Sequence, residues 1–182
     1  MTVPKEMRAA RIVEVLANDL QGSNFQVNKP YAIQTIPVPE PKGTDILVKV
    51  GAASFCHTDA LALDGSWPCP KPITGSHEGC GTVAKIGPDV PKGSYKVGDR
   101  VGLHPFYHVC GIVRLSALLT IGECHVCKRG GIGPMFCKNK GGALGLGGSD
   151  GSFAEYVITD SEFTVPIPEN VSFADTVSSS RK

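Results

Sequence analysis

Turn-forming residues interrupt this chain so often that neither a long helix nor a long strand has room to form. The 182 residues include 22 glycines and 14 prolines, spread along the whole length. Between them lie short runs that alternate in polarity or are rich in β-branched residues, as strands of an antiparallel fold are. We expect strands at 8–16, 32–38, 45–50, 79–86, 99–103, 153–158 and 163–167. Short strands separated by frequent turns predict a mainly β domain, either a sandwich or a barrel.

The run 45–50 (DILVKV) is the clearest strand, because Ile46, Val48 and Val50 would share one face. A single short helix is expected at 58–63 (TDALAL), after a threonine or aspartate cap and before Gly65.

Charge and hydropathy exclude several classes of protein. The net charge is +1, which gives no basic field to attract nucleic acid. No apolar run reaches the roughly 18 residues that span a bilayer, and the N-terminus has no signal-peptide core. We therefore expect a cytoplasmic protein with no membrane partner. Seven cysteines is an odd number, and a reducing compartment disfavours disulfides, so the cysteines indicate metal or thiol chemistry.

A thiol and an imidazole lie near the ends of two expected strands. Cys56 opens the sequence 56–59 (CHTD) shortly after the clearest strand, and His77 lies within 75–79 (GSHEG), where another strand begins. Strand ends can bring two ligands to one point, and a thiolate with an imidazole suits zinc. The alternative is that the two are unrelated core residues. A catalytic zinc needs three protein ligands, and no third one is evident nearby.

A second group comprises Cys110, Cys124, Cys127 and Cys137, and its Cys124-x2-Cys127 spacing is typical of a zinc knuckle. Four thiolates would satisfy a closed structural site. The other interpretation is a redox dithiol. That usually needs a strand-to-helix turn, whereas the flanks here are glycine-rich.

Together these motifs resemble the N-terminal catalytic domain of the zinc-dependent medium-chain alcohol dehydrogenases, of the fungal and yeast type. The likeness covers most of residues 5–175. The matching stretches are 48–50 leading into 56–59, then 64–68 (DGSWP), 75–79, 97–101 (VGDRV) and 151–156 (GSFAEY). The resemblance implies a GroES-like, partly open β-barrel with a few short helices and a cysteine-rich zinc lobe at about 104–142.

The resemblance also implies two zinc ions. Cys56 and His77 would be two ligands of the catalytic ion, Glu78 would lie beside it or act as an alternate ligand, and Asp59 would orient His77. The structural ion would be bound by Cys110, Cys124, Cys127 and Cys137.

Members of this family oxidise a small primary alcohol to an aldehyde with NAD, and they are homo-oligomers. By resemblance, Thr58 would take the alcohol proton, and His57 would contact the cofactor phosphates or extend the proton relay. Trp67 would narrow the pocket to small alcohols. Without the resemblance, Thr58 would be interpreted as a helix cap and Trp67 as a core residue.

The chain departs from the family in length. The family is about twice as long, and a Rossmann domain forms its second half. Here the glycine-rich sequence 145–150 (GLGGSD) resembles a dinucleotide-binding fingerprint only loosely, and we interpret it as a loop. We expect one domain at 1–175, an atypical tail at 176–182 and no Rossmann domain. The third catalytic ligand, a cysteine, would come later, so the chain alone should be inactive.

Two further departures are local. The segment 112–122 (IVRLSALLTIG) is an apparent insertion between Cys110 and Cys124, and removing it restores the family's spacing there. We interpret it as translated non-coding sequence. Ser76 stands where the family usually has glycine.

The function expected from the sequence is therefore that of a zinc-binding catalytic-domain fragment of an NAD-dependent alcohol dehydrogenase. One alternative is a non-enzymatic zinc-binding GroES-like module or an aberrant truncated product. Another is a thiol-redox protein that uses Cys124 and Cys127.

Overall fold

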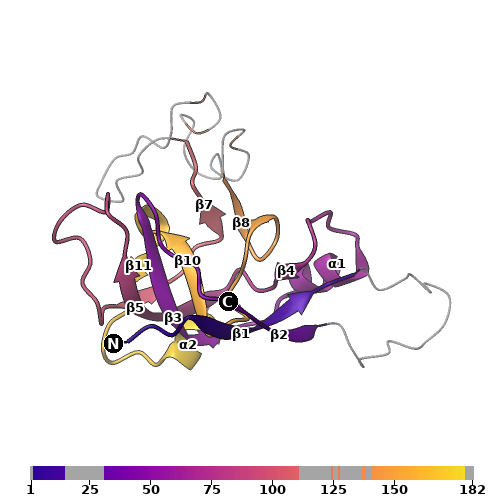
Figure 1. Cartoon of the computed structure of the whole chain (residues 1–182), viewed down its shortest axis with the longest axis horizontal. Helices are drawn as coiled ribbons and strands as arrows, with labels where there is room; N and C mark the ends of the chain where they lie inside the picture. The colour runs from indigo at the N-terminus through magenta and orange to yellow at the C-terminus, as the bar shows by residue number, and fades with distance from the viewer. Residues whose placement is uncertain are drawn as a thin grey trace.

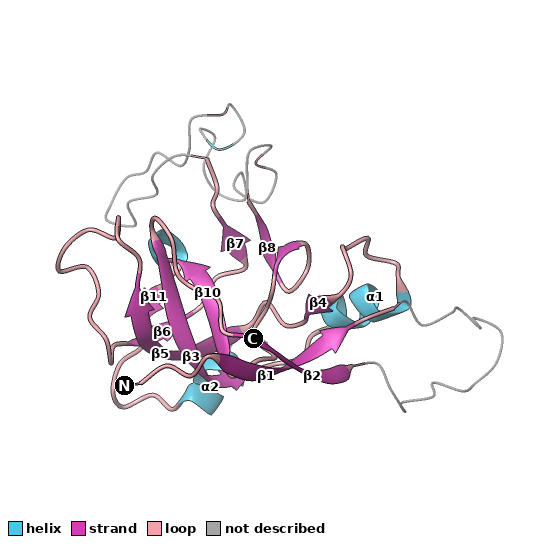
Figure 2. Ribbon diagram, in the orientation of Figure 1, coloured by secondary structure: helices cyan, strands magenta, loops and turns pink. Residues whose placement is uncertain are grey.

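Strands dominate the part of the chain that the computed structural model describes, namely residues 2–14, 31–110, 124, 127, 137 and 141–178 (Figures 1 and 2). The predicted insertion at 112–122 and residues 179–182 of the predicted tail lie outside the described residues. Within the described ranges, none of the helices has the length and apolar character needed to cross a membrane.

The main sheet has five antiparallel strands. Its order is β10 (Tyr156–Asp160), β3 (Asp45–Ala53), β5 (Gly79–Ile86), β6 (Arg100–Gly102) and β11 (Val165–Pro166). Successive side chains of a strand point to opposite faces. Ile46 and Val48 accordingly join Val83 in one buried cluster, while Leu47 joins Met7 in another. Both faces of β3 are therefore covered, and the alternation predicted for 45–50 is confirmed.

Two smaller sheets complete the β structure of the described residues. One has the order β2 (Ala32–Pro37), β1 (Glu6–Ile12) and β4 (Ile73–Thr74), and the other has the order β7 (Phe106–Tyr107), β8 (Gly142–Leu144) and β9 (Gly148–Ser149). The described strands form three separate sheets rather than one closed cylinder. This confirms the prediction of a mainly β, partly open barrel.

Two helices flank the sheets. α1 (His57–Asp64) confirms the helix expected at 58–63, and it ends at Gly65, which has the left-handed φ of 84° that glycine adopts without strain. α2 (Phe173–Ser178) was not predicted. It packs beside β3 and β5, near the lower edge of the molecule in Figure 1.

The strand predicted at 163–167 is shorter than expected. The structure has a 3-10 helix, η3 (Ser161–Phe163), followed by β11. Asp160 explains the difference, because its side chain accepts a hydrogen bond from Glu162 N (3.0 Å) and its carbonyl accepts one from the Thr164 hydroxyl (2.9 Å). Local capping of this kind competes with strand pairing.

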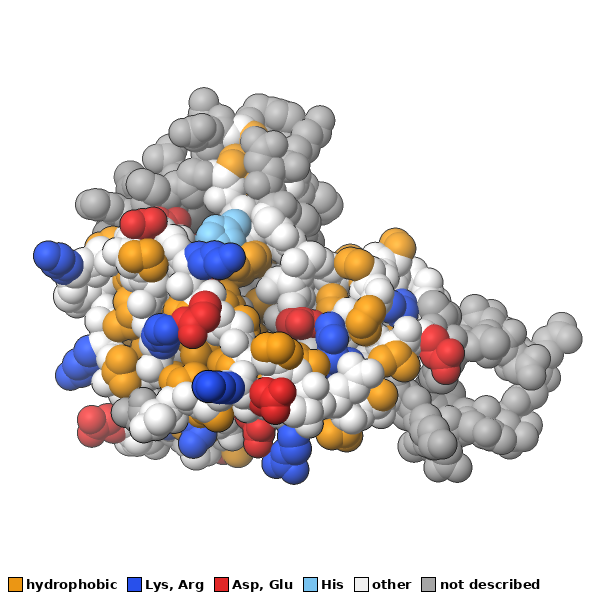
Figure 3. Space-filling view, in the orientation of Figure 1, with side chains coloured by type: hydrophobic (Ala, Val, Ile, Leu, Met, Phe, Trp, Pro, Cys, Tyr) orange, Lys and Arg blue, Asp and Glu red, His pale blue; other side chains and the backbone are white. Residues whose placement is uncertain are grey.

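Charge is mixed on the face shown in Figure 3. Basic and acidic side chains alternate there, with apolar side chains between them and no continuous field of either sign. The mixture matches the net charge of +1.

Candidate metal sites

The sequence 56–59 forms the start of α1 as a capping box. Cys56 is the N-cap residue, and its Sγ accepts a hydrogen bond from Thr58 N (3.3 Å). In return, Asp59 Oδ2 accepts a hydrogen bond from Cys56 N (3.0 Å). These bonds use N–H groups that the start of a helix leaves without partners. The predicted threonine or aspartate cap is therefore a cysteine cap, and the capping fixes the direction of the Cys56 sulfur.

The Cys56 sulfur faces His77, which lies just before β5. The distance from Cys56 Sγ to His77 Nε2 is 3.5 Å. Two such ligands of a tetrahedral zinc, with bonds of about 2.3 Å to sulfur and 2.0 Å to nitrogen, would lie about 3.5 Å apart. His77 Nδ1 is buried and, among the described residues, has no hydrogen-bond partner, so Nε2 is the nitrogen directed at Cys56. The pair has the chemistry and the spacing that zinc requires.

Asp59 connects the two segments that carry these side chains. It is fully buried, and while Oδ2 accepts from Cys56 N, Oδ1 accepts from Ser76 N (2.8 Å). A carboxylate oxygen of Asp59 also lies within 4.8 Å of the Cys56 sulfur and of a ring nitrogen of His77. Asp59 therefore restrains His77 through the backbone of the residue before it.

Ser76 has a backbone conformation that favours glycine. Its φ is 69°, in the left-handed region. The side chain is buried, and its hydroxyl lies 3.0 Å from Ser54 O and 3.2 Å from Glu78 O. The hydroxyl joins the segment after β3 to the segment before β5, which offsets part of the backbone strain.

Replacing Ser76 by alanine is expected to lower the free energy of unfolding by about 1–2 kcal/mol, because the backbone strain remains while the hydrogen bond from the buried hydroxyl to Ser54 O or Glu78 O is lost. Ser76→Gly should be more stable than Ser76→Ala by about 1 kcal/mol, since glycine adopts a positive φ without strain. Urea unfolding of both variants measures the difference. An alanine variant as stable as the glycine variant would contradict this account.

The glycine-rich sequence 145–151 packs against the backbone beside His77. Gly151 N donates to Thr74 O (2.9 Å), and Ser152 N donates to Ser76 O (2.8 Å). A Cβ added to Gly151 would lie 2.1 Å from Ser76 O, and one added to Gly145, whose φ is +66°, would lie 2.8 Å from the same atom. The predicted loop is a turn that runs into β9, and its glycines allow two backbone segments to touch.

The remaining residues predicted around the first ion lie at the start of α1 and of β5. His57 is exposed, and Thr58 is half-buried. Glu78 is half-buried and accepts a hydrogen bond from the Ser54 hydroxyl. That hydrogen bond links the Glu78 carboxylate to the segment that follows β3.

Trp67 follows α1 and is not a core residue, because 43% of it is exposed. Its backbone N donates to Leu61 O (2.8 Å), and its indole Nε1 donates to Leu146 O (3.0 Å). The second bond fixes the ring to the turn that supports Ser76.

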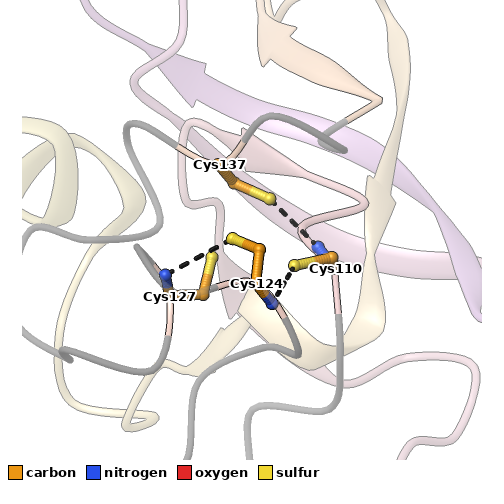
Figure 4. A group of neighbouring side chains, drawn as sticks. All are labelled: Cys110, Cys124, Cys127 and Cys137. Atoms are coloured by element: carbon orange, nitrogen blue, oxygen red, sulfur yellow. Dashed lines mark hydrogen bonds between the residues drawn. The ribbon is translucent and has the colours of Figure 1, made fainter.

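Four sulfur atoms converge in the second candidate site, although residues 111–123 separate Cys110 from Cys124 (Figure 4). All four lie within 4.8 Å of one another, and Cys127 and Cys137 are buried. Backbone N–H groups point at three of the sulfurs, from Cys110 to Cys137 (3.4 Å), from Cys124 to Cys110 (3.4 Å) and from Cys127 to Cys124 (3.5 Å). Four converging sulfurs form the donor set of a closed tetrahedral zinc site.

The protonation of these thiols distinguishes the metal and redox interpretations. Burial, followed by the neighbouring thiols of Cys124 and Cys137, raises the pKa of the Cys127 thiol. A redox dithiol depends on a lowered thiol pKa. A metal ion would displace the protons from all four sulfurs. The raised pKa disfavours the redox interpretation, and the convergence of four sulfurs favours a metal.

Two residues that the sequence analysis missed connect the cysteine lobe to the main sheet. The Tyr107 hydroxyl donates to Asp45 Oδ1 (3.1 Å), and His108 Nε2 lies 2.9 Å from the same oxygen. His108 Nδ1 lies 4.0 Å from Asp160 Oδ2. The signal in the sequence was the Tyr107-His108 pair shortly before Cys110, but their partners Asp45 and Asp160 become apparent only when the strands are paired.

A thiol–imidazole pair at two strand ends, on a mainly β scaffold with a separate four-thiol lobe, defines a zinc-binding domain of the GroES-like class. The chain belongs to the family described as "Alcohol dehydrogenase GroES-like domain", whose model matches residues 42–169.

Individual relatives are alcohol dehydrogenases. The chain is 35% identical over 152 residues to an alcohol dehydrogenase from Geobacillus stearothermophilus, covering 82% of this chain and 40% of that protein. It is 34% identical over 142 residues to an alcohol dehydrogenase from Schizosaccharomyces pombe, covering 76% and 35%. A cobalt- and zinc-bound thermostable alcohol dehydrogenase from Pyrobaculum aerophilum shares the fold, with a TM-score of 0.69, 22% identity, and coverage of 93% and 44%. The chain thus spans about 40% of the length of the curated relatives it matches.

Proposed function

We propose that this chain supplies the zinc-binding part of an NAD-dependent alcohol dehydrogenase that oxidises small primary alcohols to aldehydes. The observation that carries the proposal is the 3.5 Å separation of Cys56 Sγ and His77 Nε2, held in place by Asp59. The family membership supports the reaction class.

Each residue near this pair has a role in the proposal. Zinc bound between Cys56 and His77 would polarise the alcohol oxygen and lower its pKa. Glu78 would lie beside the ion, and Asp59 would keep the two ligands at the required distance. The four lobe cysteines would bind the structural zinc ion.

On the substrate side, Thr58 would receive the alcohol proton, and the exposed His57 would pass it to solvent or face the cofactor phosphates. Trp67 would form one wall of the pocket, because its indole is fixed to Leu146. The substrate would be a small alcohol or aldehyde.

NAD does not fit the glycine-rich turn. Gly145 and Gly151 lie against Ser76, so their backbone is not available to cradle a pyrophosphate. We assign no step of hydride transfer to the described residues. Among the residues that the structure describes, the third potential ligand grouped with Cys56 and His77 is Asp59, and both of its oxygens already accept backbone hydrogen bonds. We therefore propose that the chain alone does not oxidise alcohols. On this basis, a zinc-binding module without catalytic activity is the second candidate.

We also propose a single domain at residues 1–175, a cytoplasmic location and assembly into a homo-oligomer. The reason for the last two is the resemblance to the family. Fluorescence microscopy of the tagged chain and light scattering of the purified protein test them.

Metal analysis tests the central proposal. The purified chain should hold one firmly bound zinc ion, and a second one only in excess zinc. Cys56→Ser should remove the weaker ion and leave the firm one, because serine can still cap α1 while the thiolate of the thiol–imidazole pair is lost and the four lobe cysteines are unchanged. A chain that retains no zinc would contradict the proposal. A chelator-sensitive oxidation of ethanol with NAD by the 182-residue chain would contradict the proposed inactivity.

A further inference from the structure

The guanidinium of Arg100, at the start of β6, hydrogen-bonds to the backbone segment that leads into α2. Nη1 donates to Pro168 O (2.8 Å) and Glu169 O (2.9 Å), and Nη2 donates to Val171 O. The guanidinium carbon also lies 4.5 Å from the centre of the Phe173 ring. One planar cation thus serves three carbonyls and one aromatic face, a combination that the point charge of lysine cannot reproduce.

Phe173, the first residue of α2, contacts both central strands. A Cβ added to Gly51 in β3 would lie 2.3 Å from Cδ2 of the Phe173 ring, so the ring rests directly on the glycine backbone. The buried Cys80 thiol in β5 donates to Phe173 O (3.3 Å). Figure 1 shows α2 beside the ends of these strands.

The contacted ends of β3 and β5 are the ends that lead to the thiol–imidazole pair. Gly51 precedes Cys56 by five residues, and Cys80 follows His77 by three. Pairing continues up to the site, because Ala52 is opposite Cys80, and Ser54 N donates to Glu78 O (2.9 Å). A displacement of Phe173 would therefore act on both segments that set the Sγ–Nε2 distance.

We infer that Arg100 is a positioning residue for the Cys56–His77 metal site. By holding 168–173 in place, Arg100 keeps Phe173 against β3 and β5 and restricts the separation of the two ligands. Gly51 is exposed and Phe173 is half-buried. The coupling therefore runs through the paired strands, from Ala52 opposite Cys80 to the hydrogen bond between Ser54 N and Glu78 O. The inference rests on the proposed function, since it concerns the metal affinity of the same pair.

Cobalt titration of the full chain tests the inference, because Co²⁺ is coloured and its thiolate bands separate the four-sulfur lobe from the Cys56–His77 site. Cys56→Ser identifies the signal of the second site. Arg100→Ala and Arg100→Lys remove the guanidinium group and its hydrogen bonds to the three carbonyls. Gly51→Ala displaces the Phe173 ring and leaves the Arg100 side chain in place. Arg8→Ala is the matched control, since Arg8 has a side chain 74% exposed and pairs with Glu155 on the surface.

Both Arg100 variants and Gly51→Ala are expected to weaken Co²⁺ binding at the Cys56–His77 site about tenfold. This is the smaller end of the loss in metal affinity that follows when residues that orient the ligands are replaced. Binding in the lobe should be unchanged, and Arg8→Ala should behave as wild type. Hydrogen exchange at the α2 amides should accelerate in the Arg100 variants.

Affinities within twofold of wild type in these variants would overturn the role of Arg100 while leaving the proposed function intact. Unchanged exchange at α2 in Arg100→Ala would also overturn it. If wild type binds no Co²⁺ that Cys56→Ser removes, the proposed function fails and the inference falls with it. Co²⁺ absorption from the four lobe cysteines shows that a variant is folded. If Arg100→Ala does not fold, Gly51→Ala still tests whether displacing Phe173 weakens the metal site.

Discussion

Cys127→Ser is expected to remove one zinc ion per chain and to lower the melting temperature by about 10 °C, which corresponds to a loss of about 3–5 kcal/mol for a domain of this size. Cys127 is fully buried, and its sulfur lies within 4.8 Å of the other three. A hydroxyl in its place is a poor zinc ligand, and without the ion nothing would link the buried Cys137 to the half-buried Cys110 and Cys124. Zinc analysis and thermal unfolding measure the two effects.

Cys69→Ser provides the matched control, because Cys69 is half-buried and lies outside both candidate sites. It should keep the full zinc content and a nearly unchanged melting temperature. Chelation of the wild-type protein should reproduce the effect of Cys127→Ser. Zinc content that is the same in Cys127→Ser and in wild type would show that the four sulfurs do not bind the ion.

Asp59→Ala is expected to lower the free energy of unfolding by about 3–5 kcal/mol, because two backbone N–H groups lose a carboxylate acceptor in a fully buried position. Asp59→Asn should lower the free energy of unfolding by about 2 kcal/mol. Its amide oxygen keeps one acceptor, while the amide NH2 group faces the other donor. Both variants should also bind Co²⁺ more weakly at Cys56 and His77.

The control for this pair is Asp89→Ala, since Asp89 is exposed. Its free energy of unfolding should differ from that of wild type by less than about 0.5 kcal/mol. Urea unfolding and cobalt titration distinguish the variants. If Asp59→Asn is as stable as wild type, the carboxylate does not connect the two ligand-bearing segments.

Local patterns predicted the longer strands and α1, but not four of the strands of two or three residues, namely β4, β7, β8 and β9. The β-branched run 45–50 predicted the strand and the face shared by Ile46, Val48 and Val50, whereas the burial of Leu47 on the other face comes from packing against Met7. The end of α1 at Gly65 was predicted, but its cap is Cys56 rather than a threonine or aspartate. The prediction was wrong at 163–167, where the capping by Asp160 produces a 3-10 helix. α2 was missed because its six residues carry no periodic pattern, and its position depends on the contact of Phe173 with Arg100 in β6.

The candidate ligands were also visible in the sequence, because the Cys124-x2-Cys127 spacing is typical of a zinc knuckle and the resemblance to the alcohol dehydrogenases implied Cys56 and His77. Their arrangement was not. Cys110 meets Cys124 across a long intervening segment, and Asp59 links two backbone segments that are 20 residues apart. No spacing rule predicts such contacts.

By itself, the sequence determined the mainly β character of the chain and the residues able to bind zinc, since both follow from side-chain chemistry and short-range pattern. Only the tertiary structure decided which of those residues meet. The 3.5 Å separation of Cys56 and His77, the left-handed backbone at Ser76 and the packing of Phe173 on Gly51 arise where β3, β5 and α2 come together. Contacts between segments distant in the chain depend on the packing of the whole domain, which local sequence does not encode.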